Sequence, residues 1–317
     1  MMRFRNCFKY GIRYLTDEGY RFNINRLHFG MYHDMPDDEY LKRMFRYRMG
    51  YELDLDNPKT FSEKLQWLKL YDRKPEYTMM ADKYEVKKFV AKRIGDEYII
   101  PTLGVWNNFD EIDFDVLPDR FVLKCTHDSH GLSICKDRTK WNQQTAKKKL
   151  EEGLQQNYYY KFREWPYKNI KPRILAENYM EDTETKELRD YKFFCFSGQA
   201  RAMFIASDRQ DNTTETKFDF FDMNRNHLPF TQGHPNARPY PELPENFDIM
   251  RELAEKLSEG IPHIRVDFYE VNKVVYFGEL TFFPFAGYIP FEPEEWNIKL
   301  GDILKLPISS LKEKNEK

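Results

Sequence analysis

The first third of the chain is predicted to be helical. Hydrophobic residues recur there with helical spacing, as at Phe61, Leu65 and Leu68. Gly95 stands where the last of these helices would end, because glycine readily adopts the left-handed conformation of a C-terminal cap. The predicted helices cover residues 37–49, 61–70 and 80–93.

From about residue 121 the pattern changes to short hydrophobic runs bounded by turn residues, which is typical of strands. Ser197-Gly198-Gln199 reads as the turn of a hairpin. Two helices interrupt the strands, and residues 224–246, rich in Pro, Asn and Gly, are expected to form a long surface loop. The predicted helices cover residues 143–156 and 247–260. The predicted strands cover residues 121–125, 132–136, 174–180, 188–196, 200–206, 218–222, 264–271 and 274–281.

Composition indicates a globular protein. Of the 317 residues, 41% are hydrophobic and 32% are charged, which is unlike a disordered chain. The net charge of −2 gives no basic footprint for nucleic acid, so no nucleic-acid partner is expected. The four cysteines show no zinc-binding spacing, which favours reduced thiols and a cytoplasmic location.

The N-terminus differs from the rest of the chain in charge. Residues 1–26 hold six Lys or Arg and two Asp or Glu, mixed with Phe, Tyr, Ile and Leu. Such a segment could lie at the inner face of an anionic membrane, contact polysaccharide assembly enzymes, or pack as a helix on the main body. No run of 18 apolar residues and no signal-peptide pattern accompany it.

The last predicted hairpin carries facing acidic residues. If residues 272–274 form a three-residue loop, Asp267 falls opposite Glu279, and Arg265 falls opposite Thr281. Facing carboxylates repel each other unless a positive charge lies between them. Mg²⁺ would supply that charge, because it prefers carboxylate and phosphate oxygens. The alternative is a solvent-facing polar row that Arg265 neutralises.

Two lysines stand where phosphates could bind. Lys124 ends a hydrophobic strand and precedes the small, polar residues 126–131, whose backbone N–H groups could face phosphate oxygens. Lys83 is expected near the start of the predicted helix 80–93, where a bound anion would favour it. Either lysine could equally be an ordinary solvated side chain.

In this order the motifs resemble the ATP-grasp superfamily and, more closely, the TupA-like ATP-grasp family. The similarity covers roughly residues 40–305. The segments that carry it are PKTFSEK (58–64), ADKY (81–84), FVLKCTHDS (121–129), DYKFFCFSG (190–198), RVDFY (265–269) and FGELTF (277–282). The chain departs from the superfamily pattern at Thr281, where an asparagine is usual, and in its loop 126–131, which holds fewer glycines.

The resemblance implies an α+β ATP-grasp fold, in which two α+β lobes grip ATP. It further implies a helical extension over residues 1–57 and an N-terminal lobe over residues 58–120. A central lobe with the phosphate loop and the adenine hinge would follow over residues 121–185, and a C-terminal lobe with the metal site over residues 186–317.

The resemblance also implies roles for individual residues. Lys83 and Lys124 would hold the ATP phosphates, and Lys124 and Arg265 would act in catalysis. Mg²⁺ would be bound by Asp267, Glu279 and Thr281. The remaining residues expected around the nucleotide and the acceptor are Thr126, His127 and Ser129 of the loop, Glu177, Asn178, Tyr179 and Met180 of the hinge, and Asp190 and Lys192, which could instead be a structural ion pair.

The implied function is a carboxylate–amine ligase that forms an acyl phosphate and releases ADP and phosphate. The family is associated with bacterial cell-surface polysaccharides such as teichuronopeptide and capsule, so the acceptor would be a small molecule or a glycan. Three alternatives stay open at this point. They are a glycosyltransferase that uses a nucleotide sugar, a sugar kinase with the same ATP site, and a non-catalytic binding module.

Overall fold

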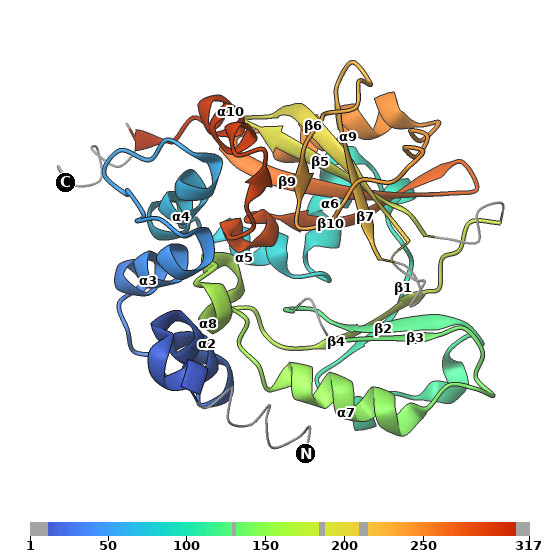
Figure 1. Cartoon of the computed structure of the whole chain (residues 1–317). Coiled ribbons are helices and arrows are strands. Elements are labelled where there is room, and N and C mark those ends of the chain that lie inside the picture. Colours follow the sequence, from blue (N-terminus) through green and yellow to red (C-terminus); the bar gives the residue numbers. More distant parts are fainter. Residues whose placement is uncertain (1–11, 129–130, 184–187, 209–214, 309–317) are drawn as a thin grey trace.

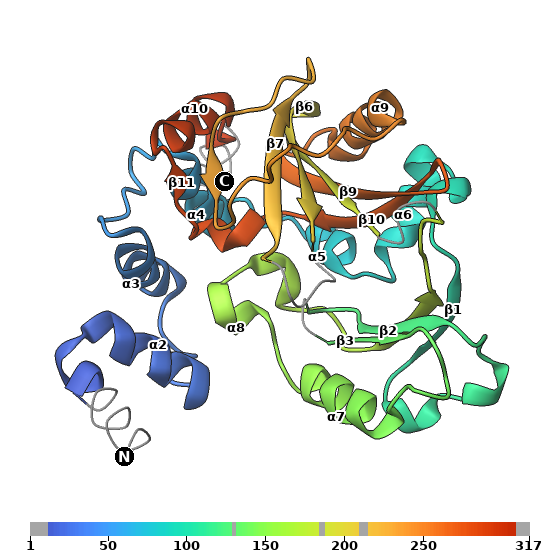
Figure 2. The same cartoon turned by 45° about the vertical axis from the view of Figure 1, so that its right-hand side comes forward.

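The computed structural model describes residues 12–128, 131–183, 188–208 and 215–308. Two antiparallel sheets of four and five strands form separate layers, and a group of N-terminal helices packs at one end of the molecule (Figures 1 and 2). This group consists of α2 Glu18–His28, α3 Asp37–Met49 and α4 Phe61–Tyr71, whereas α5 Glu76–Ala81 and α6 Val86–Ile94 lie beside the five-stranded sheet. In the part of the chain that the structure describes, no helix has the length and hydrophobicity to span a membrane.

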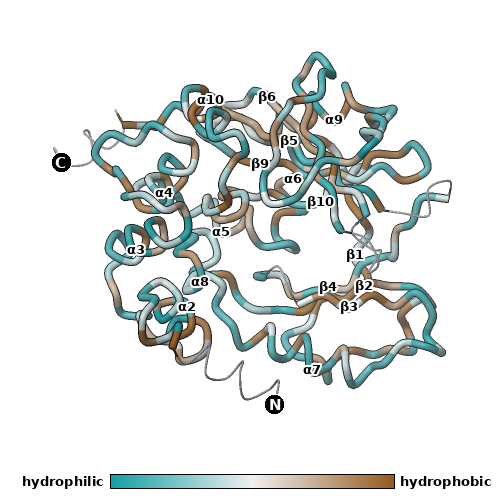
Figure 3. The backbone as a smooth tube through the Cα atoms, viewed as in Figure 1, coloured by the Kyte–Doolittle hydropathy of each residue, from teal (hydrophilic) through white to brown (hydrophobic). Residues whose placement is uncertain are grey.

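The smaller of the two sheets has the strand order β1-β4-β2-β3. Helix α7 (Gln143–Leu154) covers one face of it (Figure 1), where Leu150 packs in a core with Phe121 and Leu123. Hydrophobic segments of the chain run along its strands (Figure 3). Because side chains alternate along a strand, Lys124 lies on the other face. The bounds are β1 Thr102–Trp106, β2 Phe121–Cys125, β3 Leu132–Cys135 and β4 Ile174–Asn178.

The five-stranded sheet has the order β10-β9-β5-β6-β7. Helix α9 (Phe247–Ser258) packs on one face through Met250, Ala254 and Leu257, the spacing that predicted this helix. The bounds are β5 Asp190–Phe196, β6 Gln199–Ser207, β7 Lys217–Asp222, β9 His263–Val271 and β10 Val274–Thr281. The remaining short elements are α8 Tyr159–Phe162, β8 Thr231–Gln232, β11 Phe291–Glu292 and α10 Glu295–Ile303.

The single helix predicted over residues 80–93 is wrong, because the chain turns between α5 and α6. The carboxylate of Asp82 accepts hydrogen bonds from the backbone N–H groups of Tyr84 at 2.8 Å and Glu85 at 3.1 Å. Such a side-chain bond competes with the helical pattern and ends α5. Lys83 therefore lies in this turn and not at the start of a helix.

The β9–β10 hairpin has the predicted pairs and a different turn. Asp267 pairs with Glu279, and Arg265 pairs with Thr281. The three-residue loop is wrong, since Val274 already pairs with Val271. The extra residue sits instead in a β-bulge at Gly278, where an added Cβ would lie 3.1 Å from the carbonyl oxygen of Asp267.

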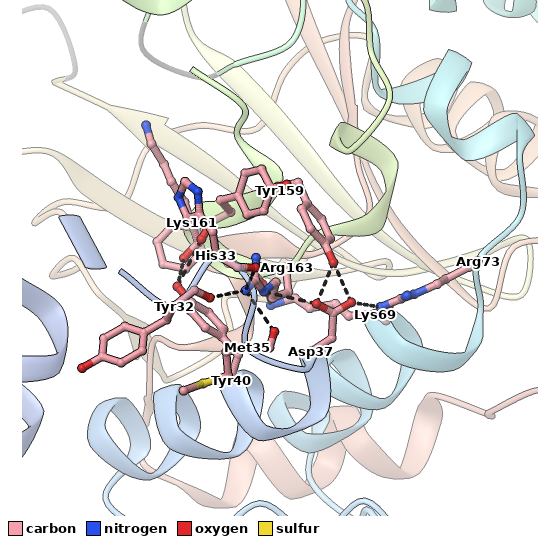
Figure 4. A network of polar contacts seen from close by, with 12 residues as sticks. Tyr32, His33, Met35, Asp37, Tyr40, Lys69, Arg73, Tyr159, Lys161 and Arg163 are labelled. Carbon is pink, nitrogen blue, oxygen red and sulfur yellow. Dashed lines mark hydrogen bonds and ion pairs between the residues drawn. The ribbon is translucent and has the colours of Figure 1, made fainter. Parts of the chain in front are cut away.

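The N-terminal helices are attached to the body by an apolar cluster and a buried arginine. Phe22, Met44 and Phe45 share a core with Tyr288. Arg163, which follows α8, donates to the carbonyl oxygens that precede α3 (Figure 4).

The boundaries of the lobes stay predictions. Strand β1, inside the range 58–120, belongs to the same sheet as β2–β4.

Candidate active site

A cavity of about 390 Å³ lies between the two sheets. Three lysines line it, and they come from three separate elements: Lys83 from the α5–α6 turn, Lys124 from β2 and Lys192 from β5. Acidic side chains of β4, β5 and β10 also face it, including Glu279. The other predicted site residues in its lining are Glu177, Asn178, Tyr179, Met180 and Asp190.

Two lysines share the buried carboxylate of Glu177. Lys124 forms an ion pair with one oxygen, and Lys87 lies 2.5 Å from the other. The antiparallel pairing of β2 with β4 places Lys124 and Glu177 on the same face of the sheet. Burial raises the pKa of the Glu177 carboxyl, but the charges of Lys124 and Lys87 outweigh it and hold the pKa below its usual value.

Lys87, which the sequence analysis missed, does not line the cavity but pairs with Glu177, which does. It also donates to the carbonyl oxygen of Ile100 at 2.8 Å and to the hydroxyl of Thr102 at 2.7 Å. Its neighbour Lys88 is exposed and pairs with Glu85 at 3.4 Å. Nothing in the sequence distinguishes these two adjacent lysines, since only the packing of α6 decides which one reaches β4.

Lys83 is held between the α5–α6 turn and the segment that follows β2. Its backbone N–H donates to the carbonyl oxygen of Thr126 at 3.0 Å, and its ammonium donates to the carbonyl oxygen of Asp128. Burial lowers the pKa of Lys83, and the charge of Lys124 adds to that effect, while Glu279 opposes it. An anion in the cavity would remove this penalty, so the placement suits a phosphate ligand.

The predicted phosphate loop is only partly directed at the cavity. Thr126 and His127 are buried and do not line it. The His127 ring instead contacts the carbonyl oxygens of Gly153, in the last turn of α7, and Gln156, just after it, at 3.1 and 3.0 Å. Asp128 does line the cavity. Ser129 lies outside the described residues.

The predicted hinge lies along the cavity at the end of β4. The backbone N–H of Asn178 donates to the carbonyl oxygen of Pro101, and Tyr179 turns its hydroxyl to Glu181 at 3.0 Å. The guanidinium of Arg120 lies 4.2 Å from the centre of the Tyr179 ring. This packing fixes the segment that follows β4 against the rim of the smaller sheet.

The paired strands of the larger sheet place a charged cluster at the end of the cavity. Arg265 donates to Asp267 through Nε and Nη2, at 2.7 Å each. The same Nη2 reaches Glu279 and the hydroxyl of Thr281, at 3.0 Å each. Lys192 forms ion pairs with Asp267 and, at 3.0 Å, with Asp190. The structural ion pair considered for Asp190 and Lys192 is therefore present, and both side chains also line the cavity.

Only one member of the predicted metal set faces the cavity. Glu279 lines it, whereas Asp267 is fully buried behind it and Thr281 lies outside the lining. Burial opposes ionisation of Glu279, but Lys192, Arg265 and Lys83 lower its pKa to about 2. Among the described residues, no group of three or more His, Cys, Asp or Glu is arranged to hold a metal ion. One or two carboxylates still suit Mg²⁺, which commonly takes its other ligands from phosphates and water.

A buried glutamate near this cluster has no counterpart in the sequence analysis. Glu164 follows the buried Arg163 and is only 4% exposed. Burial raises the pKa of its carboxyl to about 7, although the charges of Lys69 and Arg265 oppose the rise. The ammonium of Lys69 is also fully buried and donates to the carbonyl oxygen of Ala286 at 2.8 Å. No local sequence pattern marks either residue, because they meet only through the tertiary fold.

Comparisons with known proteins were made for the family, for curated proteins and for solved structures. A family model described as TupA-like ATPgrasp matches residues 63–305. No curated protein matches the chain. The D-alanine–D-alanine ligase of Helicobacter pylori is 16% identical, with 77% of this chain and 69% of that chain covered and a TM-score of 0.40.

Two further solved structures are similar to the chain. The L-amino acid ligase of Bacillus licheniformis is 13% identical over 77% of this chain and 55% of that chain, with a TM-score of 0.46. The D-alanine–D-alanine ligase of Bacillus anthracis, complexed with ATP, is 13% identical over 64% of this chain, with a TM-score of 0.38. The chain spans 53% of the length of that ligase.

Proposed function

The chain belongs to the TupA-like ATP-grasp family, and from this membership we propose that it is an ATP-dependent carboxylate–amine ligase. The α+β ATP-grasp fold expected from the sequence is confirmed by the same match. The acceptor that we propose is a small molecule or a glycan in the biosynthesis of a bacterial surface polysaccharide.

The observation that carries the proposal is the convergence of Lys83, Lys124 and Lys192 with Glu279 around one cavity. Three ammonium groups are placed to contact phosphate oxygens, and they come from the α5–α6 turn and from one strand of each sheet. A carboxylate kept ionised by its surroundings is suited to a divalent cation that bridges phosphate oxygens. This arrangement of cations and one carboxylate suits the binding of a nucleoside triphosphate with Mg²⁺.

The residues around the cavity support a division of tasks. Glu279 would hold Mg²⁺, with Asp267 and Thr281 behind it keeping Arg265 in place. Glu177, Asn178, Tyr179 and Met180 would receive the adenine at the opposite part of the lining. Arg265 lies outside the lining and bonds to Glu279, and its positive charge would steady the negative charge that develops on the transferred phosphoryl group. ATP would activate a carboxylate as an acyl phosphate, and an amine would displace the phosphate to give an amide.

The test is nucleotide binding by calorimetry on the full chain, with and without Mg²⁺. We expect micromolar, Mg²⁺-dependent binding of ATP that Glu279→Ala removes and the exposed control Glu295→Ala retains. Carboxylates and amines can then be screened in pairs for ADP release. Tight binding of a nucleotide sugar without ATP binding would overturn the ligase and favour a glycosyltransferase. ADP release that needs a sugar hydroxyl and no amine would indicate a kinase.

A further inference from the structure

The N-terminal helices place apolar residues on their outer surface. Leu15, Leu27 and Phe29 are 74%, 54% and 68% exposed, and Ile12 and Met31 are exposed beside them in the chain. These five side chains are a third of the exposed large hydrophobic residues in the described part of the chain, within a stretch of 20 residues. Isolated apolar residues on a surface are ordinary, but such a concentration is typical of a surface that binds something.

Helix α2 buries polar as well as apolar side chains. Its inner face buries the polar side chains of Asn25 and Arg26 together with Phe22. Arg26 donates to the carbonyl oxygen of Lys161 at 2.7 Å. Arg26 thus serves the attachment to the body, Asn25 bonds to Tyr14 and Tyr32 within the N-terminal segment, and Leu27 is exposed.

Charge indicates the occupant of this surface. The first 26 residues carry six basic and two acidic residues in a chain whose net charge is −2. In the described part, the side chain of Arg13 is exposed, lies 4.6 Å from the ring of Tyr20 and pairs with Asp17 at 3.2 Å. Arginine and aromatic side chains around exposed leucine and phenylalanine suit the headgroup region of an anionic bilayer.

We propose that the surface of residues 12–31, which exposes Ile12, Leu15, Leu27, Phe29 and Met31, docks on an anionic phospholipid membrane. The attachment of this surface to the body is rigid, because Arg163 and the apolar cluster around Phe22 and Tyr40 hold α2 and α3 in place (Figure 4). The cavity therefore keeps a fixed distance and orientation relative to the bilayer. This proposal does not depend on the reaction that the cavity catalyses.

Co-sedimentation of the full chain with lipid vesicles tests the proposal. We expect binding to vesicles of phosphatidylcholine with phosphatidylglycerol, little binding to phosphatidylcholine alone, and a loss of binding at high salt. The double variant Leu27→Ser/Phe29→Ser should bind roughly a hundredfold more weakly, since each buried side chain contributes about tenfold. The control Val116→Ser/Ile298→Ser removes two apolar side chains that are exposed elsewhere and should leave binding unchanged.

Three results would overturn the proposal. The first is an absence of binding to either vesicle, and the second is equal binding of both double variants. The third is a dimer in sedimentation that Leu27→Ser/Phe29→Ser dissociates, because the occupant of the surface would then be a second copy of the chain. Circular dichroism and thermal unfolding of the variants establish that they are folded. A second variant, Leu15→Glu, adds a negative charge at the most exposed of these positions and should also abolish binding.

Discussion

Lys192 on β5 lies directly opposite Asp267 on β9 and forms a buried ion pair with its carboxylate. Asp267 also accepts two hydrogen bonds from Arg265, so a fully buried carboxylate is neutralised from two sides. Glu279, on the next strand, shares Arg265 and faces the cavity. The cluster thus joins the core of the larger sheet to the part of the cavity where we place the phosphates.

Replacing Lys192 by methionine should lower the free energy of unfolding by about 3 kcal/mol, because it leaves buried carboxylates without one of their cations. Urea denaturation measures the change. The matched control is Lys299→Met, whose exposed pair with Glu295 should contribute less than about 1 kcal/mol. The double variant Lys192→Met/Asp267→Asn should lose less unfolding free energy than the two single variants lose together. Strictly additive losses would contradict the pairing.

Lys87→Met should weaken binding of ATP with Mg²⁺ by roughly tenfold, or about 1.4 kcal/mol. Glu177 now divides its charge between Lys87 and Lys124, and without Lys87 it would hold Lys124 more tightly and away from phosphates. Calorimetry on the variant gives the dissociation constant. The control is Lys88→Met, which removes the exposed neighbouring lysine. Lys87→Arg should restore most of the lost ATP affinity. Equal affinities of Lys87→Met and Lys88→Met for ATP would show that Lys87 has no part in the site.

The sequence predicted the site best where a strand fixed the geometry. Side chains alternate along β9 and β10, so a pairing of Asp267 with Glu279 also placed Arg265 and Thr281 on the same face. That pairing was derived from a three-residue loop. The real turn is one residue shorter, and the extra residue of the bulge at Gly278 restores the predicted register beyond it. Two different turns can therefore give one register, and the sequence alone did not decide between them.

The residues that the sequence analysis missed are those whose roles depend on packing between distant segments. Asp82 ends α5 through its bonds to Tyr84 and Glu85, and Arg173, 91 positions along the chain, pairs with its second oxygen. Lys87 reaches Glu177, and Glu164 lies near Arg265, only after the sheets are assembled. Periodicity describes neighbours within one element, so contacts of this kind leave no local pattern.

Glu164 should make the stability of the protein depend on pH. Its folded pKa is raised to about 7, above the usual 4.5, so the protonated form is favoured in the folded state. The stability that it contributes is therefore fully present below about pH 4.5 and is lost as the pH rises through 7, by at most about 3 kcal/mol. Urea denaturation at pH 5 to 7, below the range in which the lowered pKa of Lys69 adds stability, should show this loss in the wild type and not in Glu164→Gln. The exposed control Glu252→Gln should keep the pH dependence of the wild type, and a parallel profile for Glu164→Gln would contradict the assignment.

Arg163 should be essential for holding the N-terminal helices on the body. It is 1% exposed and donates to the carbonyl oxygens of Tyr32 at 2.6 Å, His33 at 3.0 Å and Met35 at 3.3 Å. Its Nε lies 3.2 Å from Asp37, which also accepts from Tyr159 and Arg73 (Figure 4). Arg163→Met leaves these buried oxygens without their donor, and a loss of about 3 kcal/mol in the free energy of unfolding is expected.

Limited trypsin digestion separates this role from general stability. The basic residues of α2 and α3 should become accessible in Arg163→Met well before the sheets are cleaved, because the helices detach from the body first. Arg163→Lys should recover little, since an ammonium cannot reproduce the planar guanidinium that serves three carbonyls and Asp37. Arg46→Met is the control, as this arginine of α3 is largely exposed and its pair with Glu52 at 3.4 Å contributes less than about 1 kcal/mol. If the digestion pattern of Arg163→Met matches that of Arg46→Met, the helices are held by the apolar cluster alone.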